Sequence, residues 1–265
     1  MKRMFAAIVL AACLLAAQWP IDAFVRGATT TAPTATTRQG QKIPSEDPVI
    51  KNLHSLGLID GQTNIFRSAC PVRDIAATMK TAQPTTAQLA AARANMQHLY
   101  DLGIRTVISF QTETPASAGA KSAAETQDID LERAAAQLVG ITFINDQMGN
   151  AGPNSLQTMS DQEVSAWLDA ETAKIFDHAK TGGVLFHCAA GQDRTGIVGA
   201  YIRIKFEHWP VDQAIDEMRR LGHAWITFSS NGGISSWHED HLRAIAQTLN
   251  AQPAGTTDAK TGVSP

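Results

Sequence analysis

Cysteine is scarce in this chain of 265 residues, which contains three. Three thiols cannot staple a fold of this length, so a disulfide-built scaffold is excluded. The chain also lacks an excess of basic residues: the net charge is −3, the pI is about 6.2 and no basic stripe is present, which argues against a nucleic-acid partner. Ser-His-Asp and Walker-type signatures are missing as well. No heptad pattern indicates an oligomer, so we expect a monomer.

The two ends of the chain lack the large apolar side chains that a core requires. They are rich in Thr, Ala, Pro and Gly instead, a composition that cannot fold alone. We therefore expect a disordered linker at 27–47 and a disordered tail at 251–265. One folded domain remains between them at 48–250, and its roughly 200 residues are ample for a large core.

The N-terminus has the pattern of a secretory signal peptide. A basic start, Met1-Lys2-Arg3, precedes an apolar run at 4–17 that is too short to span a membrane comfortably. We expect 1–26 to be a signal peptide or an N-terminal anchor, and the protein to be exported, either periplasmic or anchored in the membrane facing the periplasm. The stretch ending in Cys13 resembles a lipoprotein box, so ordinary cleavage and lipidation of Cys13 both stay open.

Inside the domain, apolar patterns predict strands that alternate with helices. Strands are expected at 64–71, 106–110, 141–144 and 184–187. Helices are expected at 86–102, 128–139, 161–179, 196–206, 211–221 and 235–249, with a long polar loop at 145–160. The alternation predicts an α/β fold with a central, mostly parallel sheet flanked by helices on both faces.

One segment combines an apolar run, a cysteine and an arginine. Residues 184–186 form the run, Cys188 follows, and Arg194 comes after five intervening residues. An apolar helical pattern begins next, so the segment predicts a strand, a tight loop and a helix. In that geometry the backbone N–H groups of 189–194 point into one concavity at a helix N-terminus. Such a concavity binds a dianion through its donors and the positive end of the helix dipole.

Two side chains of this segment complete the predicted site. The same field favours the Cys188 thiolate over the thiol, which makes the sulfur a nucleophile near neutral pH. Arg194 presents a planar fork that binds two phosphoryl oxygens at once. A structural cysteine beside a surface arginine is the alternative, which the coincidence of nucleophile, clamp and helix start disfavours. We expect Cys188 to attack phosphorus, with the phosphate bound by Ala189, Ala190, Gly191, Gln192, Asp193 and Arg194.

The residues from His187 to Gly196, read as His-Cys-x-x-Gly-x-x-Arg-Thr-Gly, match the signature of the cysteine-dependent protein tyrosine phosphatase superfamily. Over about residues 60–225 the chain resembles the bacterial secreted dual-specificity-like phosphatases, which share their layout with atypical dual-specificity phosphatases of fungi and plants. The further patterns that carry this resemblance are Ile65-Phe66-Arg67-Ser68-Ala69-x-Pro71, Leu102-Gly103-Ile104-x-Thr106-Val107-Ile108, Tyr201 with Trp209, and Ala214-x-x-Glu217-Met218.

Two positions depart from that family pattern. Cys70 stands where relatives usually have Gln, and Phe110-Gln111 stands where they often have Leu-Arg. Cys70 is interpreted as a small buried apolar residue. The alternative is a resolving thiol for Cys188 in an oxidising compartment.

The resemblance implies a protein tyrosine phosphatase-like fold of dual-specificity size and a two-step hydrolysis. Cys188 would form a cysteinyl-phosphate, which water then hydrolyses without a metal or a cofactor. Thr195 would assist breakdown of the intermediate, and His187 would bond the loop backbone and help to set the pKa of the cysteine. Arg67 would buttress the loop or line the pocket, unless it is an arginine at the surface end of a strand.

The acid that protonates the leaving oxygen is open among three aspartates. Asp161, 27 residues before Cys188, is our first choice, although its position also fits a helix N-terminus. Asp146, 42 residues before Cys188, is the second candidate, unless it merely ends a strand. Asp193 in the loop is the third, and its other role would be to bond loop amides or a neighbouring cation.

A second polar cluster, His238-Glu239-Asp240-His241, superficially suggests metal ligands. Its histidines are only three residues apart, it lacks the zinc-protease spacing, and we expect it on a surface helix. No metal site is therefore predicted there.

The resulting functional hypothesis is an exported phosphatase that acts on phosphotyrosine in proteins, with phosphoserine, phosphothreonine or small phosphate esters as further substrates. A phosphoinositide or inositol-phosphate phosphatase is the alternative, because the loop resembles that of bacterial members with lipid activity. Those members usually carry Lys where Gln192 stands, which disfavours this alternative. A phosphate-recognition module without turnover is a third hypothesis, which the intact Cys188 and Arg194 disfavour.

Overall fold

The computed structural model describes residues 43–113, 120–148, 156–223, 227–228 and 234–251. The expected signal peptide or anchor at 1–26, including Cys13, lies outside these residues, as do most of the expected linker and tail. Within the described ranges, no helix is both long and apolar enough to cross a membrane.

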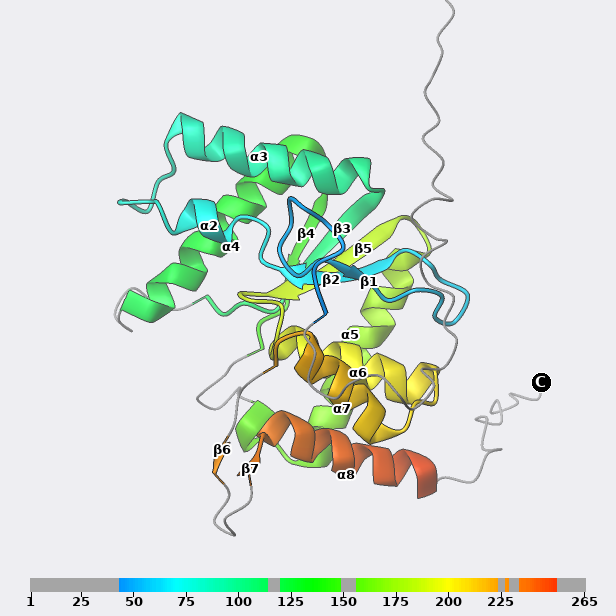
Figure 1. Cartoon of the computed structure of the whole chain (residues 1–265). Coiled ribbons are helices and arrows are strands. Elements are labelled where there is room, and N and C mark those ends of the chain that lie inside the picture. The colour runs from blue at the N-terminus through cyan, green and yellow to red at the C-terminus, as the bar shows by residue number, and fades with distance from the viewer. Residues whose placement is uncertain (1–42, 114–119, 149–155, 224–226, 229–233, 252–265) are drawn as a thin grey trace, which may run out of the picture.

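A five-stranded sheet lies at the centre of the molecule (Figure 1). Its strands, in spatial order, are β1 (His54–Ser55), β2 (Ile65–Ala69), β5 (Gly183–Cys188), β3 (Ile104–Ser109) and β4 (Thr142–Asn145). β1 runs antiparallel to β2, and every other neighbouring pair is parallel. The predicted α/β fold with a mostly parallel sheet is therefore confirmed. β1 was not predicted, because two residues are too few to show a pattern.

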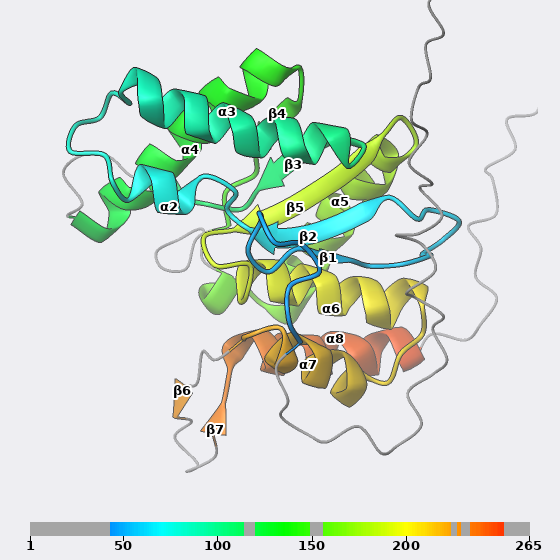
Figure 2. The same cartoon turned by 45° about the horizontal axis from the view of Figure 1, so that its top comes forward.

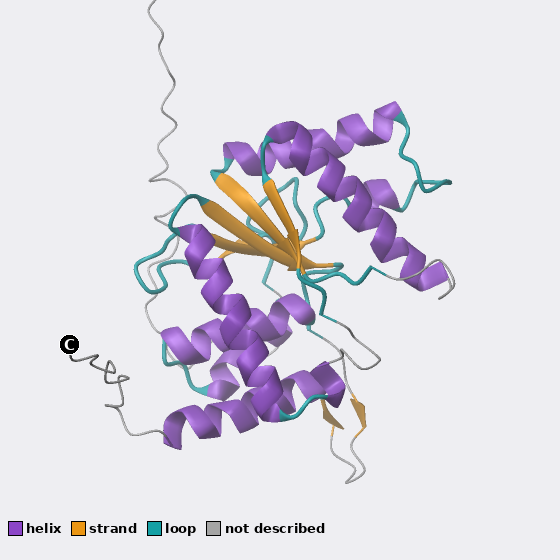
Figure 3. Ribbon diagram, turned by 180° about the vertical axis from the view of Figure 1, so that it is seen from behind, coloured by secondary structure: helices purple, strands orange, loops and turns teal. Residues whose placement is uncertain are grey.

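Helices cover both faces of this sheet (Figures 1 and 2). One face carries α2 (Arg73–Ala76), α3 (Thr86–Asp101) and α4 (Ala120–Val139). The other carries α5 (Asp161–Ala179) and α6 (Arg194–Phe206), and α7 (Val211–Arg220) and α8 (Trp237–Ala251) pack outside them (Figure 3). A short 3-10 helix, η2 (Leu156–Thr158), precedes α5, and β6 (Thr227–Phe228) pairs with β7 (Ile234–Ser235) between α7 and α8.

The central strand β5 is buried along its whole length. Val184, Phe186 and Cys188 belong to the core that α5 and α6 cover, whereas Leu185 belongs to the core beneath α3 and α4. Since successive side chains point to opposite faces of a strand, His187 lies on the α4 side and Cys188 on the α6 side. A strand buried on both faces reads as a continuous apolar run, which is why its position could be predicted.

Two predicted boundaries are wrong. α4 begins at Ala120, eight residues before the predicted start at 128. The stretch 120–127 contains strong helix formers but no apolar stripe, so periodicity could not detect it. The linker prediction extends too far, because 43–47 belongs to the fold: Ile43 N–H bonds the carbonyl of Arg220, and Asp47 is buried.

α5 lies where the sequence predicts it, at 161–179, and its first turn is capped. The helix begins at Asp161, and Ser160 accepts a hydrogen bond from the backbone N–H of Glu163. The Glu163 carboxylate accepts in turn from the N–H of Ser160 at 2.8 Å. This capping box satisfies two backbone donors that a helix start leaves unpaired, and its residue pattern can be recognised locally.

Candidate active site

The loop between β5 and α6 lies at the carboxyl ends of the parallel strands, where ligands bind in open α/β sheets. Cys188 ends β5, residues 189–193 form the loop, and Arg194 is the first residue of α6. Gly191 has a φ of +69°, and a Cβ at this position would lie 2.3 Å from the carbonyl oxygen of Ser68. Only glycine fits there, so this loop path depends on Gly191.

Two side chains hold the loop from the preceding strand and turn. Arg67 Nη2 donates to the carbonyl of Gly191 at 2.7 Å, and Asn52 Nδ2 donates to the same oxygen at 2.9 Å. Arg67 is 1% exposed, and this burial lowers its pKa to about 10, against the raising effect of Glu217 and Cys188. It therefore remains a cation at neutral pH. Of the two readings of Arg67, the structure favours the buttress over the surface arginine.

Cys188, the predicted nucleophile, is buried, with 3% of its surface exposed. Burial alone would raise the pKa of its thiol. The positive charge of Arg194, the hydroxyl of Thr195 and the backbone N–H groups of Thr195 and Gln192 outweigh burial, so the pKa of Cys188 lies below its usual value. The Thr195 hydroxyl is itself buried and has no nitrogen or oxygen partner within the described ranges, which leaves it available to the sulfur.

Arg194 is oriented by a carboxylate that was not predicted. Its Nη1 donates to the carbonyl of Phe110 at 2.9 Å and to Glu125 Oε2 at 3.1 Å, while Nη2 bonds Glu125 Oε1. Burial by itself would raise the pKa of Glu125, but the Arg194 guanidinium holds it below the usual range. A guanidinium has five N–H donors, so these three bonds fix its plane and leave donors for a bound anion.

Glu125 is one of three acidic residues that α4 turns toward the sheet, the others being Asp128 and Glu132. Their spacing of three and four residues places them on one face of the helix. Asp128 is 2% exposed, and it accepts from Gln111 Nε2 at 2.7 Å and from Arg73 Nη1 at 3.0 Å. Burial, reinforced by the two neighbouring glutamates, raises the pKa of Asp128 to about 6 despite those donors.

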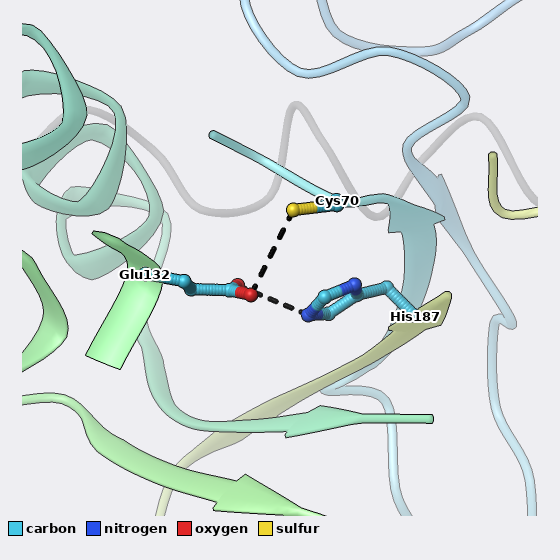
Figure 4. A group of neighbouring side chains, drawn as sticks. All are labelled: Cys70, Glu132 and His187. Carbon is cyan, nitrogen blue, oxygen red and sulfur yellow. Dashed lines mark hydrogen bonds and ion pairs between the residues drawn. The ribbon is translucent and has the colours of Figure 1, made fainter. Parts of the chain in front are cut away.

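The histidine before the nucleophile lies between Glu132 and the loop backbone (Figure 4). His187 Nε2 lies 3.0 Å from Glu132 Oε1, and Nδ1 lies 3.3 Å from the carbonyl oxygen of Cys188. Burial by itself lowers the pKa of His187, but Glu132 and the Cys188 carbonyl raise it above its usual value. The resemblance implied a contact to the loop backbone, and the contact present is to Cys188, the last residue of β5.

Cys70 belongs to the same face as His187 and not to that of Cys188. Its Sγ lies 3.8 Å from Glu132 Oε2 (Figure 4), in the core beneath α3 and α4. Cys188 belongs to the core on the other face of the sheet. Burial raises the pKa of the Cys70 thiol well above its usual value, and the acidic neighbours Glu132 and Asp128 raise it further. The geometry therefore favours the buried residue over a resolving thiol for Cys188.

All three candidate acids pair with basic side chains. Asp161 begins α5, and its side chain, 56% exposed, pairs with His241 Nδ1 of α8 at 2.6 Å. Asp146 follows β4 and pairs with Lys174 of α5. Lys174 also bonds Glu171 at 2.9 Å. Asp146 therefore forms a cluster of three charged side chains with Glu171 and Lys174 of α5.

The third candidate, Asp193, lies in the loop itself and pairs with His223. Its Oδ1 is 2.6 Å from His223 Nδ1, and Nε2 of the same histidine is 2.9 Å from Ser236 Oγ. The histidine side chain is 2% exposed. Asp193 thus ties the loop to the start of α8 through a neighbouring side chain. His223 itself was not predicted.

The cluster His238-Glu239-Asp240-His241 does not converge on one point. Glu239 bonds Arg219, whereas His241 bonds Asp161. Burial lowers the pKa of His238 to about 2, so its ring is neutral. The expectation of a surface helix is wrong for the first turn of α8, in which Trp237, His238 and Glu239 are buried.

Comparisons with known proteins give one family match and several similar solved structures. Residues 85–204 match the model of the tyrosine phosphatase family. The chain is similar to the solved structure of TpbA from P. aeruginosa, with 20% identity, 80% of this chain and 96% of that chain covered, and a TM-score of 0.46. It is also similar to the catalytic core of the PP-IP phosphatase SIW14 from S. cerevisiae (15% identity, 79% and 96% covered, TM-score 0.37) and to human DUSP28 (10%, 75% and 97%, 0.40). None of the curated proteins matches the chain.

Replacing Glu125 tests the orientation of Arg194. Glu125→Gln removes the charge that fixes the guanidinium, and a charged hydrogen bond of this kind contributes about 1.5–3 kcal/mol. We expect kcat/KM for p-nitrophenyl phosphate to fall roughly tenfold to a hundredfold. Glu113→Gln is the matched control, because that carboxylate is 43% exposed and pairs with Arg133. An unchanged kcat/KM in Glu125→Gln would show that Arg194 is positioned without it.

The lowered pKa of Cys188 is measured by alkylation with iodoacetamide at varied pH. Because only the thiolate reacts, the rate is highest above the pKa and falls as the pH drops through it. We expect the midpoint below about 8.5, the value of a free cysteine, and a higher midpoint in Thr195→Val. The Cys188→Ser variant gives the background from the other thiols. A wild-type midpoint at or above that of free cysteine would contradict the assignment of donors to the sulfur.

Proposed function

Residues 85–204 of this chain match the tyrosine phosphatase family, and from that match we propose that the protein hydrolyses phosphotyrosine in proteins, with phosphoserine and phosphothreonine as further substrates. The observation that carries the proposal is the meeting of Cys188, whose pKa is lowered, with the Arg194 clamp on one loop. A thiolate, fixed backbone donors and a guanidinium at a helix start provide what phosphoryl transfer requires.

The reaction has two steps. The Cys188 thiolate donates an electron pair to phosphorus, the S–P bond forms, and the bond to the leaving oxygen breaks as that oxygen takes a proton from an acid. We assign this acid to Asp161, the first choice of the sequence analysis, and it then accepts a proton from the water that attacks phosphorus and releases Cys188. Arg194 and the loop N–H groups stabilise the charge on the phosphoryl oxygens throughout.

The charges around the loop support a substrate with a single phosphate. Glu125 pairs with Arg194, and Asp128 pairs with Arg73, so two arginines near the loop already carry partners. Gln192, at the position where lipid-directed relatives usually have Lys, lies against Gly222, where a Cβ would come within 2.7 Å of its amide nitrogen. It adds no positive charge. Arg73 and Arg194 therefore offer little unpaired charge to a polyphosphorylated ring, which disfavours the inositol-phosphate alternative.

We also propose that the phosphatase is exported, on the basis of its N-terminal sequence pattern alone. The basic start and the apolar run at 4–17 are the features of a secretory signal. In that location Cys188 would act in an oxidising compartment.

Hydrolysis of p-nitrophenyl phosphate by the wild type and by Cys188→Ser tests the activity. We expect turnover by the wild type and only background with the serine variant, because its hydroxyl is not ionised at neutral pH. Equal background rates in both would leave phosphate recognition without turnover. A panel of phosphotyrosyl, phosphoseryl and phosphothreonyl peptides and phosphoinositide vesicles then tests the substrate. Higher kcat/KM for the vesicles than for the peptides would overturn the protein substrate.

The proton donor is tested with leaving groups of different basicity. Asp161→Asn should lower kcat about a hundredfold or more for a phosphotyrosyl peptide, and less for p-nitrophenyl phosphate, whose leaving group needs little protonation. It should also abolish the fall of kcat at high pH, since that limb reports loss of the acid's proton. Asp146→Asn and Asp193→Asn are the matched comparisons. If one of them shows this selective loss in place of Asp161→Asn, the assignment moves to that residue.

A further inference from the structure

Three buried side chains with metal-binding atoms meet behind the catalytic loop (Figure 4). Cys70 follows β2, Glu132 belongs to α4, and His187 belongs to β5. Their donor atoms all lie within 4.8 Å of one another. Glu132 and His187 are 0% exposed and Cys70 is 6% exposed, so this cluster is buried, unlike the groups of acidic side chains that are common on protein surfaces. None of the three serves as nucleophile, clamp or acid in the proposed reaction.

The hydrogen bonding within the cluster is incomplete. Glu132 Oε1 and His187 Nε2 face each other at 3.0 Å, close enough for an ion pair, yet neither atom has an aligned hydrogen-bond partner among the described residues. A buried pair that is close but poorly aligned leaves part of its hydrogen-bonding capacity unused. A ligand placed between these atoms and the Cys70 sulfur would satisfy them together.

The other ring nitrogen of His187, Nδ1, already contacts a backbone carbonyl, as the second nitrogen of a metal-binding histidine does. Nδ1 lies 3.3 Å from the carbonyl oxygen of Cys188, which accepts only if Nδ1 carries a proton. Metal-ligating histidines nearly always donate their other N–H to a carbonyl or carboxylate, which fixes the tautomer. Nε2 is thereby left to bind an ion on the side of Glu132.

We propose that Cys70, Glu132 and His187 form a binding site for a divalent transition-metal ion of the Zn²⁺ type. A thiolate, an imidazole and a carboxylate are the donor set of zinc, whereas Mg²⁺ and Ca²⁺ select oxygen atoms. Three protein ligands leave one position of a tetrahedral ion for a water molecule.

The observed separations are close to those that such an ion needs. Metal–ligand bonds of about 2.0–2.3 Å place neighbouring tetrahedral ligands roughly 3.2–3.7 Å apart. The distances are 3.0 Å between His187 Nε2 and Glu132 Oε1 and 3.8 Å between Cys70 Sγ and Glu132 Oε2. All three donor atoms lie within 4.8 Å of one another, so binding would draw the side chains closer together.

The ion would bind by displacing the proton of the Cys70 thiol, because zinc binds the thiolate and a neutral imidazole. The thiolate and the Glu132 carboxylate would offset the two charges of the cation, which avoids the large cost of burying an unpaired ion. Nearby, Asp128 and Arg73 pair with each other at 3.0 Å.

The ion would touch the catalytic loop from behind. His187 directly precedes Cys188, and the backbone N–H of Cys70 donates to the carbonyl of Ala189 at 3.3 Å. Of the three ligands, His187 therefore directly precedes Cys188 in the chain, and Cys70 bonds Ala189, the residue that directly follows Cys188.

Cobalt titration of a chain with a single thiol tests the site. The untagged full-length chain with Cys13→Ser and Cys188→Ser retains Cys70 as its one cysteine and is inactive, so the result is independent of the proposed phosphatase activity. We expect one equivalent of Co²⁺ to produce the near-ultraviolet thiolate-to-cobalt charge-transfer band, and Zn²⁺ to abolish it by displacement. Glu132→Gln and His187→Gln in this background should weaken Co²⁺ binding at least about tenfold, whereas Glu113→Gln should not.

The same chain with Cys70→Ser is the decisive comparison, and circular dichroism confirms that it is folded. It should lose the charge-transfer band and the rise in melting temperature that Zn²⁺ produces in its parent. Two results would overturn the proposal: no charge-transfer band in the parent at a few equivalents of Co²⁺, or an equal Zn²⁺-induced rise in melting temperature with and without Cys70. The second result would assign zinc binding to other residues of the chain.

Discussion

A negative charge on a buried sulfur is the constraint on which this site depends. Cys188 lies at the end of the central strand, where burial opposes ionisation of its thiol. The thiolate forms only because Arg194, Thr195 and loop N–H groups supply compensating charge and hydrogen bonds. Those donors must be held rigidly, since mobile dipoles would stabilise the anion much less. Much of the surrounding structure can be understood as support for them.

The support comes from both sides of the sheet. On the α6 side lie the nucleophile and the helix that Arg194 begins, while on the α4 side lie His187 and an acidic helix face. The alternation of side chains along β5 sends one residue to each face, so consecutive residues have different surroundings. Glu125 reaches across to orient the arginine, and Glu132 holds the histidine that bonds the peptide of Cys188. One helix thus positions both the anion clamp and the strand end.

Local patterns predicted the elements that have local causes. The strand of β5, the loop with its cysteine and arginine, and the capped start of α5 all follow from short stretches of sequence. The start of α4 did not, because 120–127 has helix-forming residues without an apolar stripe. That error concealed Glu125, which lies 69 positions before its partner Arg194. Asn52 and His223 were not predicted either, because nothing near them in the sequence indicates the loop that they support.

The sequence by itself determined the chemistry: the order of nucleophile, loop glycine, clamp and helix start lies within one short segment, and local backbone geometry brings those groups together. Only the tertiary structure decided what surrounds them. It set Cys70 and Cys188 on opposite faces of the sheet, directed Asp193 to His223 and turned the acidic face of α4 toward the loop. These pairings join residues far apart in the chain, and their geometry follows from strand order and helix packing, which no local pattern records.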